Sequence, residues 1–251
     1  MITDPYFYLC AIPAVLLFGM AKGGLGGGLA ILSVPILSLV VSPLQGAAIM
    51  LPILVVMDAV AVWSFRHSWS RANIRATLPG ALAGIAVGAL TFPYLSEDAV
   101  KVLIGVVAVV FGLDYWRPRT APEAPAAISH RKGNFWGMVS GFTSFGIHAG
   151  GIPISVYLLP QQLAKKQLMG TFAVFFGIVN VVKLLPYGLL GQFSAENLAT
   201  SLALMPIAPL GVLFGYRVLT RISQALVYQL SYGFLVVVGA KLLWEGVAGL
   251  V

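Results

Sequence analysis

The chain has 251 residues, of which 59% are hydrophobic and only 9% are charged, and its mean hydropathy is +0.94. A soluble domain is usually about a quarter charged, so this composition excludes an ordinary soluble domain and indicates an integral protein of the lipid bilayer. The formal net charge of +7 does not indicate nucleic-acid binding, because the basic residues lie in short loops between apolar blocks, where they orient a membrane protein.

Eight apolar blocks follow one another along the chain. They cover residues 6–41, 43–65, 76–93, 99–116, 135–160, 167–190, 198–216 and 223–247. A helix needs roughly 20 apolar residues to cross the hydrocarbon core, so most of these blocks predict membrane spans. Glycine-rich sequences interrupt the first block at Gly19–Gly28 and the fifth at Gly146–Gly151.

The two halves of the chain resemble each other. Residues 117–133 are rich in proline, alanine and charge, which predicts a flexible linker between a first half, 1–116, and a second half, 134–251. Seven residues recur in order at one of two spacings, 124 or 127, and these matches predict a duplication. The pairs are Gly27 and Gly151, Gly46 and Gly170, Asn73 and Asn197, Pro79 and Pro206, Gly84 and Gly211, Gly88 and Gly215, and Gly112 and Gly239.

Loop charges predict that the second half is inverted relative to the first. Eleven of the fifteen basic residues lie in loops that we expect to be cytoplasmic. They are Arg66, Arg71, Arg75, Arg117, Arg119, Arg131, Lys132, Lys165, Lys166, Arg217 and Arg221. The loops 94–98 and 191–197 contain acids and no bases, so we expect them outside, and equivalent loops of the two halves then face opposite sides. This orientation predicts an inner-membrane protein with both termini in the periplasm.

Inversion requires an odd number of crossings in each half. The requirement is met if the first and fifth blocks enter and leave on the same face, with the glycines at the tip of each hairpin. The sequence therefore predicts an all-α polytopic membrane protein made of two inverted repeats, each with a glycine-broken re-entrant helix hairpin and three full spans. Non-helical backbone at membrane depth is tolerated where it lines a polar cavity or is buried in protein.

The two breaks predict a site for a small anion. A half-helix that begins at a break directs unpaired N–H groups and the positive end of its dipole towards the tip. Ionisable and amide side chains inside the blocks add to these donors, and such residues in a span are candidates for function. The predicted substrate-binding residues are Lys22, Gly23, Gly24, Gly26, Gly27, Gly28, His148, Gly150, Gly151, Asn180 and Lys183, and Asp58 is the candidate for coupling transport to protons.

Each of these residues also has a structural interpretation. The glycines can serve close helix packing. Lys183 lies about one turn from the outer end of its span, where its side chain can reach the interface. Asp58 can simply pair with a basic residue, His148 can be a hydrogen-bonded core histidine, and Lys22 can extend to the membrane surface.

Enzymatic functions have little support in the sequence. There is no H-E-x-x-H motif and no Cys/His cluster, so we expect no metal, no cofactor and no enzyme activity. Ser144 and His148 lie four residues apart and imitate a serine–histidine dyad, but no second motif accompanies them. The glycine stretch fails as a nucleotide loop, because Leu29 stands where G-x-G-x-x-G requires glycine.

Two segments resemble the paired glycine-rich signatures of the TauE/SafE family of sulfite and organosulfur anion exporters. They are A-K-G-G-L-G-G-G-L-A-I-L-S-V-P-I-L, beginning at Ala21, and G-F-T-S-F-G-I-H-A-G-G-I-P-I-S-V-Y-L-L-P, beginning at Gly141. The resemblance covers nearly the whole chain and implies export of sulfite or a sulfoacetate-like organosulfonate by alternating access to one central site. An anion channel that uses the same broken helices is the alternative. The sequence does not indicate an oligomeric state.

Overall fold

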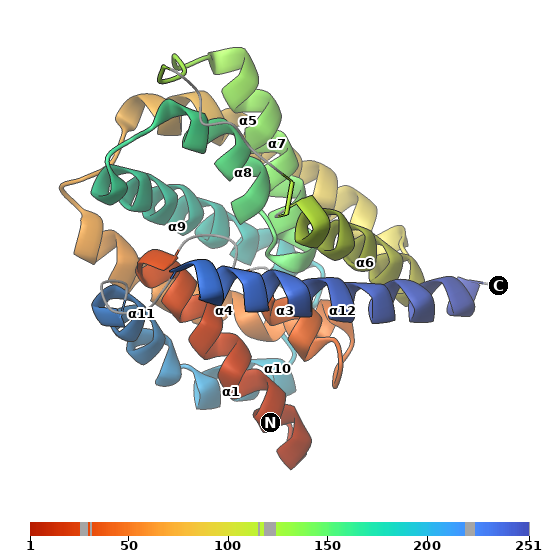
Figure 1. Cartoon of the computed structure of the whole chain (residues 1–251). Helices are drawn as coiled ribbons and strands as arrows, with labels where there is room; N and C mark the ends of the chain where they lie inside the picture. Colours follow the sequence, from red (N-terminus) through yellow and green to blue (C-terminus); the bar gives the residue numbers. More distant parts are fainter. Residues whose placement is uncertain (26–29, 31, 115, 118–123, 219–223, 251) are drawn as a thin grey trace.

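The computed structural model describes residues 1–25, 30, 32–114, 116–117, 124–218 and 224–250, and every regular element within them is helical (Figure 1). The predicted all-α class is therefore confirmed for the described residues. In chain order the elements are α1 (Pro5–Met20), a π-helical turn η1 (Ala21–Leu25), α3 (Ser33–Leu37), α4 (Pro43–Phe65), α5 (Arg71–Thr91), η2 (Phe92–Tyr94), α6 (Glu97–Asp114), α7 (His130–Ile147), α8 (Gly151–Leu158), η3 (Leu159–Gln161), α9 (Lys165–Leu189), α10 (Ala195–Leu204), α11 (Ile207–Val218) and α12 (Gln224–Leu250).

Four helical segments within the described residues are long and apolar enough to cross a membrane, and a fifth is obtained if one bent pair counts as a single span. The four segments are Pro5–Gly24, Pro43–Phe65, Arg71–Tyr94 and Lys165–Leu189. Their bounds lie within a few residues of the predicted blocks, except that the first block is divided. The chain is therefore a multi-pass membrane protein.

The block predicted as one span over 198–216 is broken. Helices α10 and α11 meet at an angle of 40°, with Met205 and Pro206 between them. Proline has no N–H for the helical hydrogen bond and disfavours helical backbone at the preceding residue, which accounts for the break. Its sequence counterpart Pro79 lies inside the uninterrupted helix α5, so proline alone did not predict the difference.

Serine residues start α5 and α10 in the same way. The hydroxyl of Ser70 accepts from the N–H of Asn73, and the hydroxyl of Ser194 accepts from the N–H of Asn197. One turn later the hydroxyls of Thr77 and Ser201 donate to the carbonyl oxygens of these asparagines. Each residue of the first cluster lies 124 positions before its counterpart in the second cluster. A serine N-cap satisfies an N–H that has no partner in the helix and contributes about 1 kcal/mol.

The most extensive helix packing joins the first half of the chain to the second. Helix α5 packs on α7, α6 on α12, α1 on α11 and α4 on α9. Glycines permit the close approach: a Cβ on Gly84 of α5 would lie 2.0 Å from the carbonyl oxygen of Met138, and a Cβ on Gly215 of α11 would lie 2.5 Å from that of Met20. Any side chain at these positions would separate the helices.

The residues on both sides of the first glycine-broken block contact α10. The N–H of Ile2 donates to the hydroxyl of Thr200 (3.0 Å), and the amide of Gln45, at the start of α4, donates to Asn197 (3.2 Å). The chain therefore returns close to its starting point between residues 2 and 45.

The second broken block has the corresponding contacts with α5. The side-chain amide oxygen of Asn134, near the start of α7, accepts from the N–H of Gly80 (2.9 Å), and the amide of Asn73 donates to Gln161, which follows α8 (2.9 Å). The N–H of Ala126, just before α7, also donates to the carbonyl of Pro160 (2.9 Å). The start and end of the second block therefore lie together as well.

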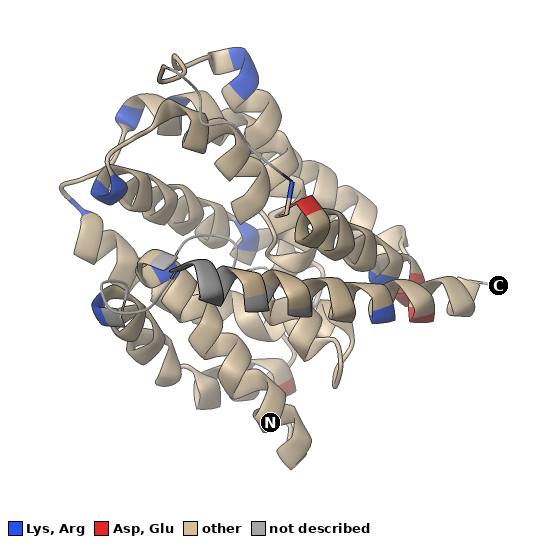
Figure 2. Cartoon of the chain, viewed as in Figure 1, with Lys and Arg blue, Asp and Glu red and all other residues tan. Residues whose placement is uncertain are grey.

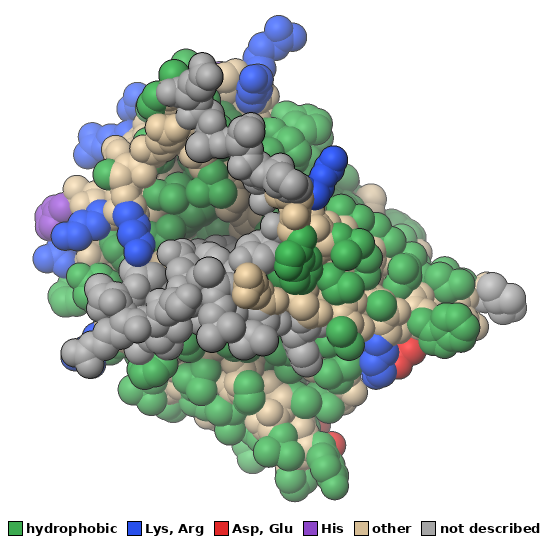
Figure 3. All heavy atoms as spheres, in the orientation of Figure 1, with side chains coloured by type: hydrophobic (Ala, Val, Ile, Leu, Met, Phe, Trp, Pro, Cys, Tyr) green, Lys and Arg blue, Asp and Glu red, His purple; other side chains and the backbone are tan. Residues whose placement is uncertain are grey.

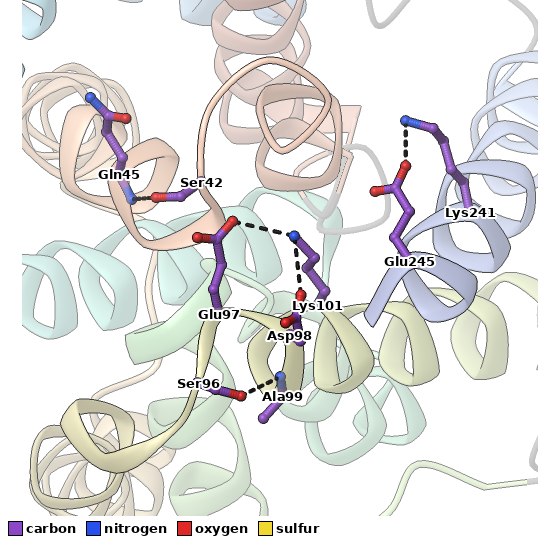
Figure 4. Close-up of polar contacts among 9 residues, drawn as sticks. All are labelled: Ser42, Gln45, Ser96, Glu97, Asp98, Ala99, Lys101, Lys241 and Glu245. Atoms are coloured by element: carbon purple, nitrogen blue, oxygen red, sulfur yellow. Dashed lines mark hydrogen bonds and ion pairs between the residues drawn. The ribbon is translucent and has the colours of Figure 1, made fainter. Parts of the chain in front are cut away.

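Charged side chains gather at opposite ends of the helices. Figure 2 shows most loop Lys and Arg residues towards the upper left of the view, whereas both ends of the chain lie towards its lower and right edges. At the end with the acidic loops, Lys101 pairs with Glu97 and Asp98, each at 3.3 Å, and Lys241 pairs with Glu245 (Figure 4). Hydrophobic side chains cover most of the described surface between these ends in the view of Figure 3, as expected for contact with lipid tails.

Candidate functional site

The second predicted break lies between α7 and α8. Helix α7 ends at Ile147, His148 adopts the left-handed conformation with a φ of 54°, and α8 begins at Gly151. The Ser140 hydroxyl donates to the Gly150 carbonyl (2.7 Å) and fixes the turn from within α7. A histidine rather than a glycine therefore occupies the left-handed position, a conformation uncommon for residues other than glycine.

The first break begins where α1 ends. The chain continues into the π-helical turn η1, and the backbone leaves helical geometry at Gly24, whose φ is 139°. Glycine adopts this conformation without steric cost. Gly23 serves packing, because a Cβ there would lie 2.2 Å from the Val212 carbonyl oxygen of α11. The predicted site residues Gly26, Gly27 and Gly28 lie outside the described residues.

A cavity of about 50 Å³ lies between the two breaks. One water needs roughly 10–15 Å³ on this measure, so the cavity has room for a small ion or a few waters. Helices α1, α4, α7, α8 and α9 all contribute to its wall. The lining residues are Phe18, Ala21, Lys22, Ala30, Leu54, Asp58, Ala61, Ser144, His148, Gly151, Met169, Phe172, Ala173, Phe176 and Asn180.

A charged pair forms one side of this cavity. Lys22 and Asp58 make a direct ion pair, with side chains that are 10% and 4% exposed. The side-chain amide of Asn180 donates to the other carboxylate oxygen of Asp58 (2.6 Å), so both oxygens of the buried carboxylate have a donor. Lys22 therefore does not extend to the surface, and Asp58 pairs with a base, as its structural interpretation predicted.

Two aromatic rings lie next to the ammonium group of Lys22. Its Nζ lies 5.5 Å from the ring centre of Phe18 and 5.6 Å from that of Phe176. The negative faces of such rings attract a cation and add to the carboxylate in holding it. Neither phenylalanine was predicted, because aromatic residues are common in apolar spans and carry no distinguishing pattern.

Lys183 and His148 form a second polar cluster behind the cavity. Lys183 is fully buried, and its Nζ donates to the carbonyl (2.8 Å) and hydroxyl (3.1 Å) of Ser144 and to His148 Nδ1 (2.8 Å). His148 Nε2 lies 2.9 Å from the Ala47 carbonyl, which can only accept, so Nε2 carries the proton and Nδ1 accepts from Lys183.

These hydrogen bonds decide between several interpretations from the sequence. Lys183 does not extend to the interface. The hydroxyl of Ser144 bonds Lys183 rather than the His148 ring, so the two do not form a serine–histidine dyad. No group of three or more metal-binding side chains occurs among the residues that the structure describes.

Five predicted site residues line the cavity together: Lys22, Asp58, His148, Gly151 and Asn180. Lys183 lies behind them, and Gly23, Gly24 and Gly150 are adjacent in sequence but are not part of the lining. Residues far apart in the chain, on both sides of residues 117–133, thus meet at one place in the membrane protein.

Comparison with known proteins identifies the family. The family model described as "Sulfite exporter TauE/SafE" matches residues 11–242. The chain belongs to the TauE/SafE family. The chain is also similar to the probable sulfite/organosulfonate exporter TauE of Cupriavidus necator, with 26% identity over 186 residues that cover 70% of this chain and 69% of that protein. No solved structure matches the chain.

Membership of the TauE/SafE family makes the chain one of a family of membrane transporters, which agrees with the predicted absence of enzyme activity. The match spans both breaks and all five cavity residues named above. In this TauE/SafE protein the cavity is therefore the candidate site for the transported ion.

Proposed function

We propose that this chain exports sulfite or a small organosulfonate, such as sulfoacetate, across the inner membrane by alternating exposure of one central site. The family match and the name of the Cupriavidus relative support this class of substrate. The observation that carries the proposal is the position of Lys22 and the first turn of α8 on the walls of one cavity.

The anion is held by backbone donors and one cation. The first turn of a helix has N–H groups without intrahelical acceptors, and the helix dipole adds about half a positive charge at that end. Gly151 is the first residue of α8 and lines the cavity, and the missing side chain lets an oxyanion approach these N–H groups. Lys22 provides the full positive charge nearby.

Asp58 balances Lys22 when the site holds no anion. An unpaired ammonium is costly in a membrane interior, and the carboxylate removes that cost. An arriving anion competes with Asp58 for Lys22, and protonation of Asp58 favours the anion in this competition. This exchange gives Asp58 its proposed role in proton coupling.

Alternating access follows from an inverted arrangement of the halves 1–116 and 134–251, joined by the linker 117–133. Three observations support it: the matched Ser, Asn and Ser/Thr clusters at the starts of α5 and α10, the packing of first-half helices on second-half helices, and the return of each broken block to its starting point. Inverted repeats with broken helices at a central site are a recurring transporter plan. The segment Pro5–Gly24 is long enough to cross the membrane, but the contacts of Ile2 and Gln45 with α10 favour a hairpin.

The proposed orientation places the basic loops in the cytoplasm and both termini in the periplasm. The separation of loop bases from the ends of the chain in Figure 2 supports it. A reporter that is active only in the cytoplasm, fused after Val251, stays silent in this arrangement. Strong reporter activity contradicts it.

Counterflow in proteoliposomes tests the function. Vesicles loaded with unlabelled sulfite should take up labelled sulfite faster than vesicles without it. A carrier that has released labelled sulfite inside returns faster when it is loaded with unlabelled sulfite. Uptake that is fast but independent of preloading indicates an anion channel instead. No uptake of sulfite, sulfoacetate or related sulfonates contradicts the proposed substrate class.

A further inference from the structure

A second cavity lies on the other side of the end of α7 from the first cavity. Its volume is about 250 Å³, and it is framed by the beginning of α4, the segment after α5, the end of α7 and the end of α9. The lining residues are Leu44, Phe92, Pro93, Leu95, Phe145, Gly146, Tyr187, Leu190 and Gln192. Leu95 and Gln192 belong to the two acidic loops 94–98 and 191–197, so this outer cavity lies at the end opposite the basic loops.

One face of α9 connects the two cavities. Phe172, Phe176 and Asn180 recur every four residues and line the first, inner cavity. Tyr187, two turns further, lines the outer cavity. Lys183 lies between Asn180 and Tyr187 on the same face and is fully buried, so this part of the face carries polar side chains through the region that separates the cavities.

The separating layer is formed by neighbouring residues at the end of α7 and just after it. Ser144 and His148 line the inner cavity, whereas Phe145 and Gly146 line the outer one. Two sets of hydrogen bonds tie this stretch to α9: Lys183 donates to Ser144 and His148, and the Tyr187 hydroxyl donates to the Phe145 carbonyl.

Aromatic rings fill the layer. The rings of Phe145 and Tyr187 lie edge to face with centres 5.1 Å apart, and the side chains are buried, at 3% and 4% exposure. The ring of Phe92 also packs edge to face against Phe145, with centres 5.7 Å apart. The rings of Phe145 and Tyr187 are in contact, so an ion cannot pass between them in this conformation.

We propose that the outer cavity is a second chamber of the transport path and that Phe145 and Tyr187 form the gate between it and the inner site. The proposal rests on the proposed transport function. The gate opens when the Tyr187 hydroxyl leaves the Phe145 carbonyl and the α7 end moves away from α9. The anion then passes Lys183 along the polar face of α9.

Side-specific labelling of single cysteines tests the gate without requiring transport. In a Cys10→Ser background, Ala173→Cys reports on the inner cavity and Gln192→Cys on the outer one. The full chain is reconstituted in one known orientation, and a membrane-impermeant maleimide is added to either side. Ala173→Cys should react only from the side of the basic loops, and Gln192→Cys only from the side of the acidic loops.

Opening the gate should change this pattern. With Tyr187→Ala or Phe145→Ala, one from each wall, Ala173→Cys should react from both sides, at rates within a few-fold of each other. Tyr187→Phe keeps the ring but loses the hydrogen bond, so labelling from the acidic side should rise less. Leu185→Ala, on the exposed face of α9, is the matched control and should leave Ala173→Cys one-sided.

Each result decides the proposal. Labelling of Ala173→Cys that stays one-sided in folded Tyr187→Ala and Phe145→Ala proteins overturns it, and so does Gln192→Cys that is unreactive from the acidic side without any gate change. If the gate variants do not fold, the Tyr187→Phe protein decides, since unchanged rates there count against the gate. Gated labelling without counterflow of sulfite or any of the sulfonates refutes the proposed substrate class alone, whereas counterflow with ungated labelling refutes only the gate.

Discussion

Lys22 and Asp58 are joined across 36 residues by an ion pair that is almost entirely buried and that forms part of the cavity wall. Lys22 belongs to the glycine-rich break and Asp58 to the continuous helix α4. The pair therefore fixes the broken element to a continuous one, and any anion that binds Lys22 must compete with the carboxylate.

Breaking this pair on one side should affect stability and binding differently from removing both charges. Lys22→Met leaves Asp58 buried and unpaired, which should lower the free energy of unfolding by roughly 3–5 kcal/mol. The remaining carboxylate also repels the substrate. Anion affinity should therefore be highest in the wild type, lower in the double variant Lys22→Met with Asp58→Asn, and lowest in Lys22→Met alone. Binding should stay measurable in all three proteins, because the N-terminal end of α8 remains.

Denaturant unfolding and anion titration of the three proteins check this order. The double variant should recover most of the lost stability, because two neutral side chains no longer require each other. Equal stability of the single and double variants would show that Asp58 is not held by Lys22.

Asp58→Asn should separate coupling from translocation. Asparagine keeps the shape of the side chain and a partner for Asn180 but cannot carry a proton at neutral pH. Uptake driven by a proton gradient should fall to the level of vesicles without protein, while exchange of substrate for substrate continues. Asp98→Asn, at the start of α6 and partly buried, serves as the matched control and should retain gradient-driven uptake.

Survival of gradient-driven uptake in Asp58→Asn would assign the carboxylate a structural role only. Loss of both activities would instead place Asp58 in the translocation step itself. Either result is read from the same vesicles.

Glycines 150 and 151 should respond differently to alanine. A Cβ on Gly150 would lie 2.6 Å from the Ser140 carbonyl oxygen, so Gly150→Ala should destabilise the fold. Gly151 lines the cavity, so Gly151→Ala should remain folded and lose affinity for the anion, by about tenfold or roughly 1.4 kcal/mol. Thermal unfolding and anion titration distinguish the two effects.

The control for both is Gly233→Ala in α12, where a Cβ would meet nothing within 4 Å. Unchanged anion affinity in Gly151→Ala would mean that the first turn of α8 is not a ligand. The corresponding substitution Gly27→Ala falls outside the described residues, and we expect it to weaken anion binding as well.

Lys183→Met should act mainly on stability. It removes the donor to Ser144 and His148, and each buried group left without a partner costs about 1–3 kcal/mol. Because Lys183 does not line the cavity, anion affinity should fall less than in Lys22→Met. Lys241→Met, which removes an exposed ammonium from α12, should leave the unfolding temperature unchanged.

A Lys183→Met protein as stable as the wild type would contradict the hydrogen bonds that we assign. A larger loss of affinity than in Lys22→Met would identify Lys183 as a direct ligand. Both quantities come from the same titration and unfolding experiments.

The sequence predicted those features that depend on long patterns. Continuous apolar runs located α4 and α9 because the length of a span is set by the bilayer, and the glycines and His148 located the second break. Lys22, Asp58 and Asn180 were singled out because ionisable and amide side chains are costly within spans and therefore conspicuous there. That the three line one cavity comes from the structure.

Other features leave no trace in a single apolar sequence. Phe145 and Tyr187 look like any aromatic pair in a span, and only the structure shows that their rings pack together at the outer cavity. The bend at Pro206 was missed because its counterpart Pro79 is accommodated without one. In the first break, packing against α11 rather than a ligand accounts for Gly23.

A crystal structure of the protein with selenite, which resembles sulfite in shape and charge, tests the central claim that the anion binds between the two breaks. Selenium scatters anomalously, so its position is measured independently of the side chains. The account predicts a peak within hydrogen-bonding distance of Lys22 Nζ and the N–H groups at the start of α8, and a weaker peak in Gly151→Ala crystals soaked at the same selenite concentration. A selenite peak elsewhere in a protein that transports sulfite would contradict it.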